Sequence, residues 1–173
     1  PGENPTAWGF EVNIAGHAGG GPATYLSEQN YGHRRDGEAN SPFAIPDLQT
    51  YWGTGTFLTE ALTREAVKAL DKAKKYGQPF FLNMAHYAVH IPIDRDMRFF
   101  AKYVRKGMSD KEAAYASLIE GMDKSLGDLM QWLRENGEEE NTIILFMSDN
   151  GGYATGSYWR DEPLYTQNAP LRC

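Results

Sequence analysis

The chain has 173 residues, of which 41% are hydrophobic, 23% are charged and 13% are aromatic. This composition allows a buried core and excludes a chain that is disordered throughout. The 17 Lys and Arg residues against 23 Asp and Glu residues leave a formal charge of −6, which argues against nucleic acid as a partner. No run approaches the roughly 18 apolar residues that a membrane helix requires, so no membrane span is expected.

Residues 1–57 form a long region with no sustained period of 2 or 3.6, rich in Gly, Pro, Asn and aromatic residues. We expect a loop that packs against a partner, which could be the rest of the same protein. Its central run from Gly19 to Pro22 lacks the Lys and the Ser or Thr of a phosphate-binding loop. The chain starts at Pro1 without an initiator Met, and we expect an internal fragment of a longer protein.

Residues 58–77 follow with apolar residues on one face, acidic residues early and lysines late, which predicts an amphipathic helix that begins near Thr59 and ends at Gly77. Residues 80–87 are nearly continuous in apolar character and predict a strand buried on both faces. A short helical pattern then covers residues 97–104.

The most regular helix signal begins at Ser109, which forms a capping-box pattern with Glu112. Behind it, apolar residues recur at intervals of four, four, three and four, at Leu118, Met122, Leu126, Leu129 and Leu133. This helix should end near Gly137, and residues 142–148 predict a second buried strand. Alternating helices and strands with long connections predict an α/β fold with parallel strands.

Ligands of open α/β sheets collect beyond the carboxyl ends of the strands. The second predicted strand leads into Asp149 and Asn150, which are followed by two glycines. Adjacent carboxylate and amide oxygens suit Ca²⁺ or Mg²⁺, but the same residues could form an ordinary turn with their side chains bonded to local backbone. The pentapeptide from Ser148 to Gly152 leaves both interpretations open.

Two histidines follow the first predicted strand. His86 favours a structural role as a hydrogen-bonded core residue, whereas His90 precedes Ile91 and Pro92, where the stiffened chain could aim the ring into a cleft. An imidazole at that position could donate to a substrate oxyanion. His17, His33, Arg34 and Arg35 could bind anions or form a solvated face, and their roles stay open. Cys173, the single cysteine, excludes an intrachain disulfide and has no evident neighbouring base.

Several segments, in their order and spacing, resemble one enzyme family: residues 9–13, 58–63, 79–82, 86–93, 148–152 and 169–172. Together they resemble the central part of a type I, formylglycine-dependent sulfatase of the arylsulfatase family. The resemblance spans nearly the whole chain. Its most specific parts are the segment that carries His90 before Pro92 and the segment from Ser148 to Gly152.

This resemblance implies an alkaline-phosphatase-like α/β fold with a mostly parallel sheet flanked by helices, present here as a partial domain. Residues 1–173 would be the central part of the catalytic domain, with residues 1–57 loop-rich and residues 58–173 α/β. It also implies a sulfuric ester hydrolase with a divalent metal, usually Ca²⁺. By position, Asp149 and Asn150 would be metal ligands, and His90 would contact the sulfate group or the leaving oxygen. A metal cation and an imidazole can both stabilise the negative charge of a sulfuryl transition state.

The family nucleophile is a formylglycine made from Cys or Ser in a Cys/Ser-x-Pro-x-Arg motif, which does not occur in these residues. We therefore expect this nucleophile upstream of the chain, and we expect the chain alone to bind metal weakly and to be inactive. The resemblance implies a sulfated sugar or aryl sulfate as substrate and a periplasmic or secreted location. It does not identify the sulfate ester or the oligomeric state. A metal-dependent phosphoesterase of the same fold and a non-catalytic α/β module that binds a glycan or partner remain the alternatives.

Overall fold

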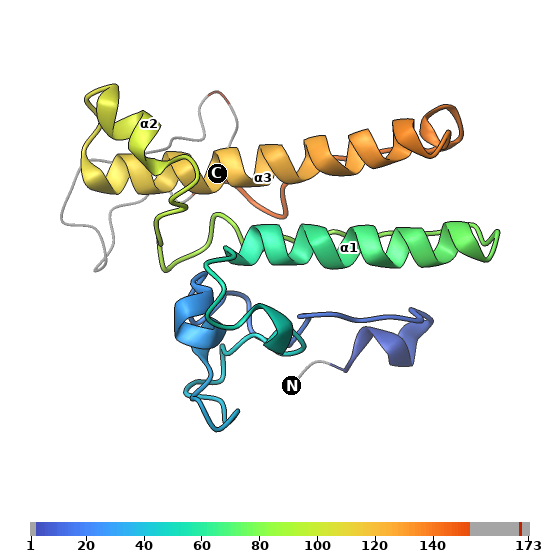
Figure 1. Ribbon diagram of the computed structural model, residues 1–173, viewed down its shortest axis with the longest axis horizontal. Helices are drawn as coiled ribbons and strands as arrows, with labels where there is room; N and C mark the ends of the chain where they lie inside the picture. The colour runs from blue at the N-terminus through green and yellow to red at the C-terminus, as the bar shows by residue number, and fades with distance from the viewer. Residues whose placement is uncertain (1–2, 153–169, 171–173) are drawn as a thin grey trace.

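A computed structural model describes residues 3–152 and residue 170 of the chain. The described elements are four short 3-10 helices and three α-helices: η1 (Pro5–Trp8), η2 (Ser27–Gly32), η3 (Gln49–Tyr51), α1 (Leu58–Lys75), α2 (Phe100–Arg105), α3 (Asp110–Glu135) and η4 (Glu139–Asn141). Figure 1 shows α3 and α2 above α1, with the loop-rich N-terminal region below α1. The helix α1 is therefore the middle layer.

The helix α1 confirms the predicted amphipathic helix, with Glu60 in its first turn and lysines in its last. It begins at Leu58, so Thr59 lies inside the helix and is buried. Two polar contacts join α1 to α3: the hydroxyls of Thr63 and Ser125 lie 2.6 Å apart, and the Trp132 indole donates to Asp71 at 2.7 Å. These contacts fix the pairing of the two helices.

The helix α3 begins with the capping box that the sequence predicts, because the Ser109 hydroxyl accepts from the Glu112 N–H and the Glu112 carboxylate accepts from the Ser109 N–H. It ends at Glu135, before Gly137 at φ +68°. The short helix α2 begins at Phe100, three residues later than predicted. The reason is a turn at Asp96, whose carbonyl accepts from the N–H groups of both Phe99 and Phe100.

Residues 3–57 of the loop-rich region share a buried core with α1 and α3, so elements of this same chain are a packing partner of the loop. The fully buried residues of this core come from loop, helix α1 and helix α3, and include Tyr25, Tyr31, Ile45, Leu48, Leu58 and Leu118. Side-chain hydroxyls satisfy buried carbonyls within the loop, as where Tyr31 donates to the Thr56 carbonyl at 2.7 Å. The irregular backbone is therefore packed against α1.

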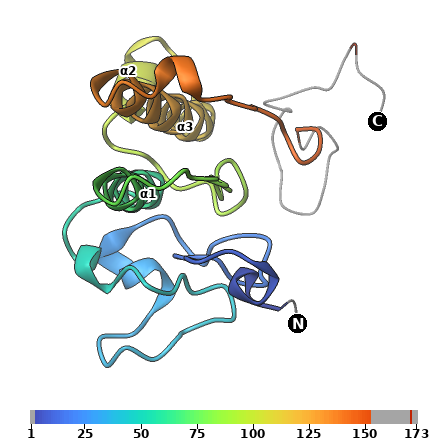
Figure 2. The same cartoon turned by 90° about the vertical axis from the view of Figure 1, so that its right-hand side faces the viewer.

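Residues 80–87 and 142–148, which the sequence predicts as strands, run as extended segments. They do not pair, and no strand occurs within residues 3–152. Among the described residues, no backbone hydrogen bond involves residues 79–86 or 143–149 with another backbone group. Two extended segments without neighbouring strands gain little stability from pairing. This is the physical reason that the predicted parallel sheet is not formed here. Figure 2, which views α1 and α3 nearly end-on, shows both segments on the same side of the helix pair.

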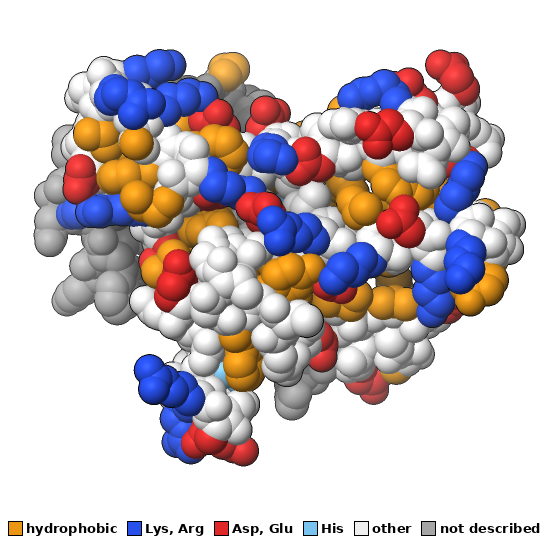
Figure 3. Space-filling model, in the orientation of Figure 1, with side chains coloured by type: hydrophobic (Ala, Val, Ile, Leu, Met, Phe, Trp, Pro, Cys, Tyr) orange, Lys and Arg blue, Asp and Glu red, His pale blue; other side chains and the backbone are white. Residues whose placement is uncertain are grey.

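A buried ion pair ties the segment after His90 to the helices. The Asp96 carboxylate is fully buried and accepts from the Arg98 guanidinium at 2.5 and 2.9 Å, while the Asp96 N–H donates to Ser117 on α3 at 3.0 Å. Arg98 also reaches Glu60 on α1 at 2.5 Å. Elsewhere acidic and basic side chains are interspersed over the face of the helices in Figure 3. No helix in the described residues is long and apolar enough to cross a membrane.

Candidate active site

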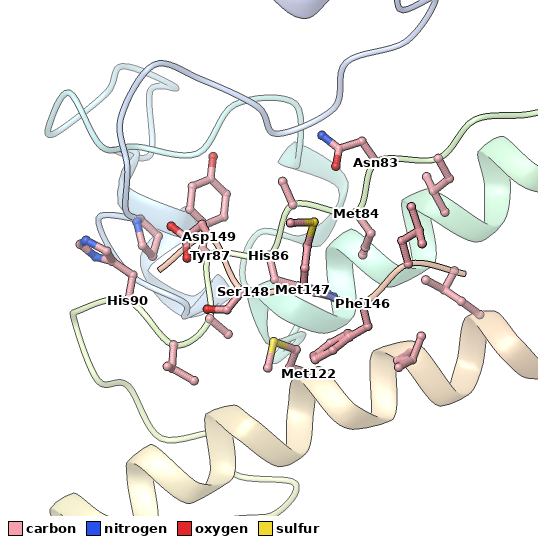
Figure 4. A pocket seen from close by; sticks show the side chains of 18 of the residues that line it. Asn83, Met84, His86, Tyr87, His90, Met122, Phe146, Met147, Ser148 and Asp149 are labelled. Carbon is pink, nitrogen blue, oxygen red and sulfur yellow. The ribbon is translucent and has the colours of Figure 1, made fainter. Parts of the chain in front are cut away.

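One large cleft, with a volume of about 2930 Å³, runs between the two extended segments and α3. Its walls include residues 77–93 and 141–152 together with the glycine-rich loop at residues 20–23. His90, Asp149 and Asn150 all line this cleft. Figure 4 shows Ser148, Asp149 and Tyr87 at the end of the cleft where His90 lies, and Met122 and Phe146 farther along the cleft. His90 therefore shares one end of the cleft with Ser148 and Asp149.

The imidazole of His90 has a defined hydrogen-bonding state. Its Nδ1 lies 2.8 Å from the Ile91 carbonyl oxygen, which can only accept, so Nδ1 carries a proton and Nε2 is the nitrogen left for a ligand. The ring packs against the backbone of the glycine-rich loop, since a Cβ placed on Gly21 would lie 2.3 Å from Nδ1. Only a glycine at this position leaves room for the ring as it stands.

The turn that carries His90 is held by side chains from the loop-rich region. The Tyr25 hydroxyl lies 2.6 Å from the Tyr87 carbonyl and 2.9 Å from the His90 carbonyl. The Tyr87 hydroxyl in turn donates to the Ala15 carbonyl at 2.6 Å, and burial raises the pKa of Tyr87 to about 12, so it remains a donor. Sequence reasoning missed both tyrosines because no local pattern indicates contacts between residues more than 60 positions apart.

Asp149 and Asn150 are exposed on the cleft and bonded mainly to their own backbone. The Asp149 carboxylate accepts from the Asn150 N–H at 2.9 Å, the Asn150 amide donates to the Gly151 carbonyl at 2.9 Å, and the Ser148 hydroxyl donates to the Asn150 carbonyl. These contacts form an ordinary local turn, which is one of the two interpretations that the sequence allows for residues 148–152. Among the described residues, no other hydrogen bond occupies the second carboxylate oxygen of Asp149 or the amide oxygen of Asn150, and both oxygens suit a hard divalent cation.

A complete cation site needs more ligands than this pair. Ca²⁺ takes about six to eight oxygens, and residues 3–152 contain no group of three or more His, Cys, Asp and Glu side chains placed to hold a metal. The donor set of Asp149 and Asn150 therefore fits a divalent cation in chemistry, and it amounts to part of a coordination sphere.

His86 lies deeper than His90, and its Nδ1 is buried without a hydrogen-bond partner among the described residues. Burial lowers the pKa of His86 to about 4, so the ring is neutral near pH 7. This burial agrees with a structural role, but within the part of the chain that the structure describes Nδ1 does not make the hydrogen bond that the sequence predicts for a core histidine.

The remaining candidate side chains of the loop have local roles in the structure. His17 accepts from the Gly19 N–H at 2.8 Å, its ring stacks on Tyr87 at 5.6 Å, and burial lowers its pKa. His33 packs on Trp52 with the ring centroids 5.1 Å apart. Arg34 pairs with Asp36, while Arg35 is exposed. Of these residues, only His17 contacts the turn that carries His90.

Comparison with known proteins adds to this geometry. The family model described as Sulfatase matches residues 9–171. The chain belongs to the sulfatase family. It is 34% identical to the uncharacterized sulfatase YdeN of Escherichia coli (strain K12), over 68% of this chain and 21% of YdeN. It is 29% identical to a sulfatase of Formosa agariphila, over 98% of this chain and 30% of that protein, and 31% identical to mouse arylsulfatase J, over 62% and 18%.

Among solved structures, the chain is similar to Ps i-CgsB, with 38% identity and a TM-score of 0.52 over 56% of this chain and 21% of that one. A second crystal structure of Ps i-CgsB, in complex with k-i-k-neocarrahexaose, gives 37% identity and a TM-score of 0.53. The family and these neighbours imply an alkaline-phosphatase-like fold. The chain spans about a fifth to a third of the length of the curated relatives named above. Members of the family act on sulfate esters and in general use a divalent metal and a formylglycine.

Proposed function

We propose that this chain supplies part of the active site of a sulfuric ester hydrolase whose substrate is a sulfated sugar or an aryl sulfate. The observation that supports this proposal is the shared cleft, which His90, Asp149 and Asn150 all line and in which His90 lies at the same end as Asp149. An imidazole, together with a cation that the two oxygen donors would hold, suits the tetrahedral anionic group of a sulfate ester, whose oxygens need positive charge and hydrogen-bond donors.

In this proposal His90 binds the sulfate group or the leaving oxygen through Nε2. The ring acts as a donor when it is protonated, and the Nδ1–H bond to Ile91 keeps its orientation fixed in either state. A donor that contacts an oxygen where negative charge grows stabilises the transition state more than the ground state. Removal of such a donor typically costs about 10²–10³ in kcat.

Asp149 and Asn150 would hold a divalent cation, for which we propose Ca²⁺. When bound, this cation would neutralise charge on the sulfate oxygens. The pair provides too few ligands for a full coordination sphere, so further ligands have to come from residues or waters other than these two. The nucleophile, in the same proposal, is a formylglycine outside the 173 residues, and the chain alone is inactive.

We further propose that residues 80–87 and 142–148 are strands of one mostly parallel sheet in the complete protein. Their apolar side chains support this proposal, since Ile143, Leu145 and Met147 are 88%, 84% and 82% exposed in the chain described here. Apolar side chains this exposed in a row indicate a surface that is normally covered. A periplasmic or secreted location remains a prediction from the family resemblance.

A phosphoesterase of the same fold is the second candidate, because phosphate presents a similar tetrahedral set of oxygens to the same cleft. The test is hydrolysis of 4-nitrophenyl sulfate and 4-nitrophenyl phosphate by the full-length protein in the presence of Ca²⁺. We expect the sulfate ester to be cleaved with the higher kcat/KM. Preference for the phosphate ester would favour the phosphoesterase, and no cleavage of either ester or of a sulfated sugar would favour a non-catalytic binding module.

A further inference from the structure

Tyr25 is a fully buried residue of the loop-rich region with a fixed position. Its ring stacks on Phe57 with the centroids 5.3 Å apart and an interplanar angle of 9°. Its carbonyl accepts from the N–H of Leu58, the first residue of α1, at 2.9 Å. The ring and backbone of Tyr25 are therefore attached to the middle layer of the fold.

The hydroxyl of Tyr25 reaches both ends of that turn. It lies 2.6 Å from the Tyr87 carbonyl and 2.9 Å from the His90 carbonyl, while the His90 N–H itself donates to the Tyr87 carbonyl at 2.8 Å. A phenol has one proton, so the two carbonyls share it. Burial, and next the nearby carboxylate of Asp94, raise the pKa of Tyr25, which keeps the phenol protonated and able to donate.

The chain that leaves the turn is attached to the same place. One carboxylate oxygen of Asp94 accepts from the Tyr25 N–H and from the Thr24 hydroxyl, each at 2.8 Å. Thr24 and Tyr25 are thus bonded to the segment 87–94 at three places: Tyr87, His90 and Asp94. The glycine-rich loop, only a few residues before Tyr25, lies against the His90 ring through Gly21.

We propose that Tyr25, supported by Thr24 and Asp94, is a positioning residue that holds the His90 imidazole at its place in the cleft. Tyr25 acts through the carbonyls of the turn and has no contact with substrate. The inference rests on the proposed function, because it concerns the side chain to which that proposal assigns sulfate binding. A ring that shifts by about 1 Å from its productive place can lose on the order of 10²-fold in rate.

The test uses Tyr25→Phe in the full-length protein, with Tyr31→Phe as the matched control. Tyr31 is equally buried, and its hydroxyl also donates to a backbone carbonyl, that of Thr56, at 2.7 Å. Both variants lose one buried hydroxyl, so both should lose similar stability. We expect Tyr25→Phe to lower kcat on 4-nitrophenyl sulfate at least about tenfold with KM within twofold, and Tyr31→Phe to keep both constants within twofold.

Thr24→Val provides a second variant of nearly equal shape that removes the hydroxyl, which donates to Asp94 and accepts from the Leu26 N–H. We expect a smaller fall in kcat with KM unchanged, and this variant decides the matter if Tyr25→Phe does not fold. Equal loss of kcat in the Tyr25 and Tyr31 variants, or unchanged kcat in both Tyr25→Phe and Thr24→Val, overturns the proposal.

A spectroscopic readout separates this inference from the proposed function. Nitrogen-15 chemical shifts of the His90 ring at pH 8 should report the Nδ1–H tautomer in the wild-type protein and in Tyr31→Phe, and a mixture of tautomers in Tyr25→Phe. If the wild-type protein cleaves no sulfate ester, the proposed function fails, and these shifts alone decide whether Tyr25 positions the ring. Identical shifts in all three proteins overturn the positioning role.

Discussion

Two kinds of irregular backbone meet at the cleft, and they differ in how they are held. Residues 13–57 and 87–98, the anchored segments, are joined by long-range bonds from buried side chains to distant backbone, such as Tyr25 to Tyr87 and Tyr87 to Ala15. Residues 79–86 and 143–152, the extended segments, have the strongest apolar patterns, yet Phe81, Leu145 and Met147 are each more than 80% exposed.

The comparison shows that apolar side chains alone do not make a segment of this chain form regular, hydrogen-bonded structure. Side-chain hydroxyls and carboxylates satisfy the backbone of the anchored segments, whereas the backbone groups of a strand need a neighbouring strand. His90 belongs to the first kind of region, and Asp149 and Asn150 belong to the second. The two halves of the proposed site are therefore supported in different ways.

The largest expected effect concerns the buried ion pair of the anchored segments. Asp96→Ala leaves Arg98 without its buried partner, and we expect the free energy of unfolding to fall by about 3–5 kcal/mol. Asp110→Ala removes an exposed pair with Arg95 and should cost about 1 kcal/mol or less. Urea unfolding of the chain measures both, and similar losses in the two variants would contradict the role given to Asp96.

The next effect concerns His86 in the extended segments. Since burial lowers its pKa to about 4, the unfolded chain takes up a proton as the pH falls from 6.5 and the folded chain does not until near pH 4. The contribution of His86 to the free energy of unfolding is therefore complete above pH 6.5. It falls by about 3 kcal/mol as the pH falls from 6.5 to 4, at 1.36 kcal/mol per pH unit. Urea unfolding of wild type and His86→Gln at several pH values should give curves that diverge in this range, and parallel curves would speak against burial of the ring.

Calcium should act on the extended segments through Asp149. At a Ca²⁺ concentration about 100 times the Kd, the free energy of unfolding of the full-length protein should rise by about 2.7 kcal/mol. Asp149→Ala should lose this gain, whereas Asp128→Ala, which removes an exposed carboxylate paired with Lys124 on α3, should keep it. Thermal unfolding with and without Ca²⁺ measures the difference. An equal gain in both variants would contradict the assignment of Asp149 as a calcium ligand.

The smallest effect probes the contact between the glycine-rich loop and the His90 ring. A Cβ on Gly21 would meet Nδ1 of His90, so Gly21→Ala must displace the ring, and we expect kcat on a sulfate ester to fall about tenfold. Gly20→Ala is the control, because a Cβ at Gly20 meets nothing within 4 Å. Steady-state kinetics of the full-length protein separate the two variants, and equal kcat values would mean that the contact does not position the ring.

The sequence predicted the helices well because their signals are local. The capping box at Ser109 and the apolar spacing from Leu118 to Leu133 place α3 almost to the residue, and the charge distribution of α1 places that helix equally well. Strand pairing, in contrast, depends on neighbouring strands more than on local signals, and no strand occurs among the described residues.

For the site, the sequence identified His90, Asp149 and Asn150 as candidates, and all three line one cleft. Their roles remain predictions. Tyr25 and Gly21 could not be found in this way, because their contacts with the turn at His90 join residues 62 or more positions apart, and only the folded chain brings them together.

The central claim is that His90 and Asp149 act on the same sulfate group. A double-mutant cycle with His90→Gln, Asp149→Ala and the combined variant of the full-length protein, measured as kcat/KM on a sulfate ester, tests it most directly. We expect the two losses to be non-additive, with a coupling of about 0.5–3 kcal/mol. Losses that add within about 0.3–0.5 kcal/mol would place the two residues at separate sites and contradict the account.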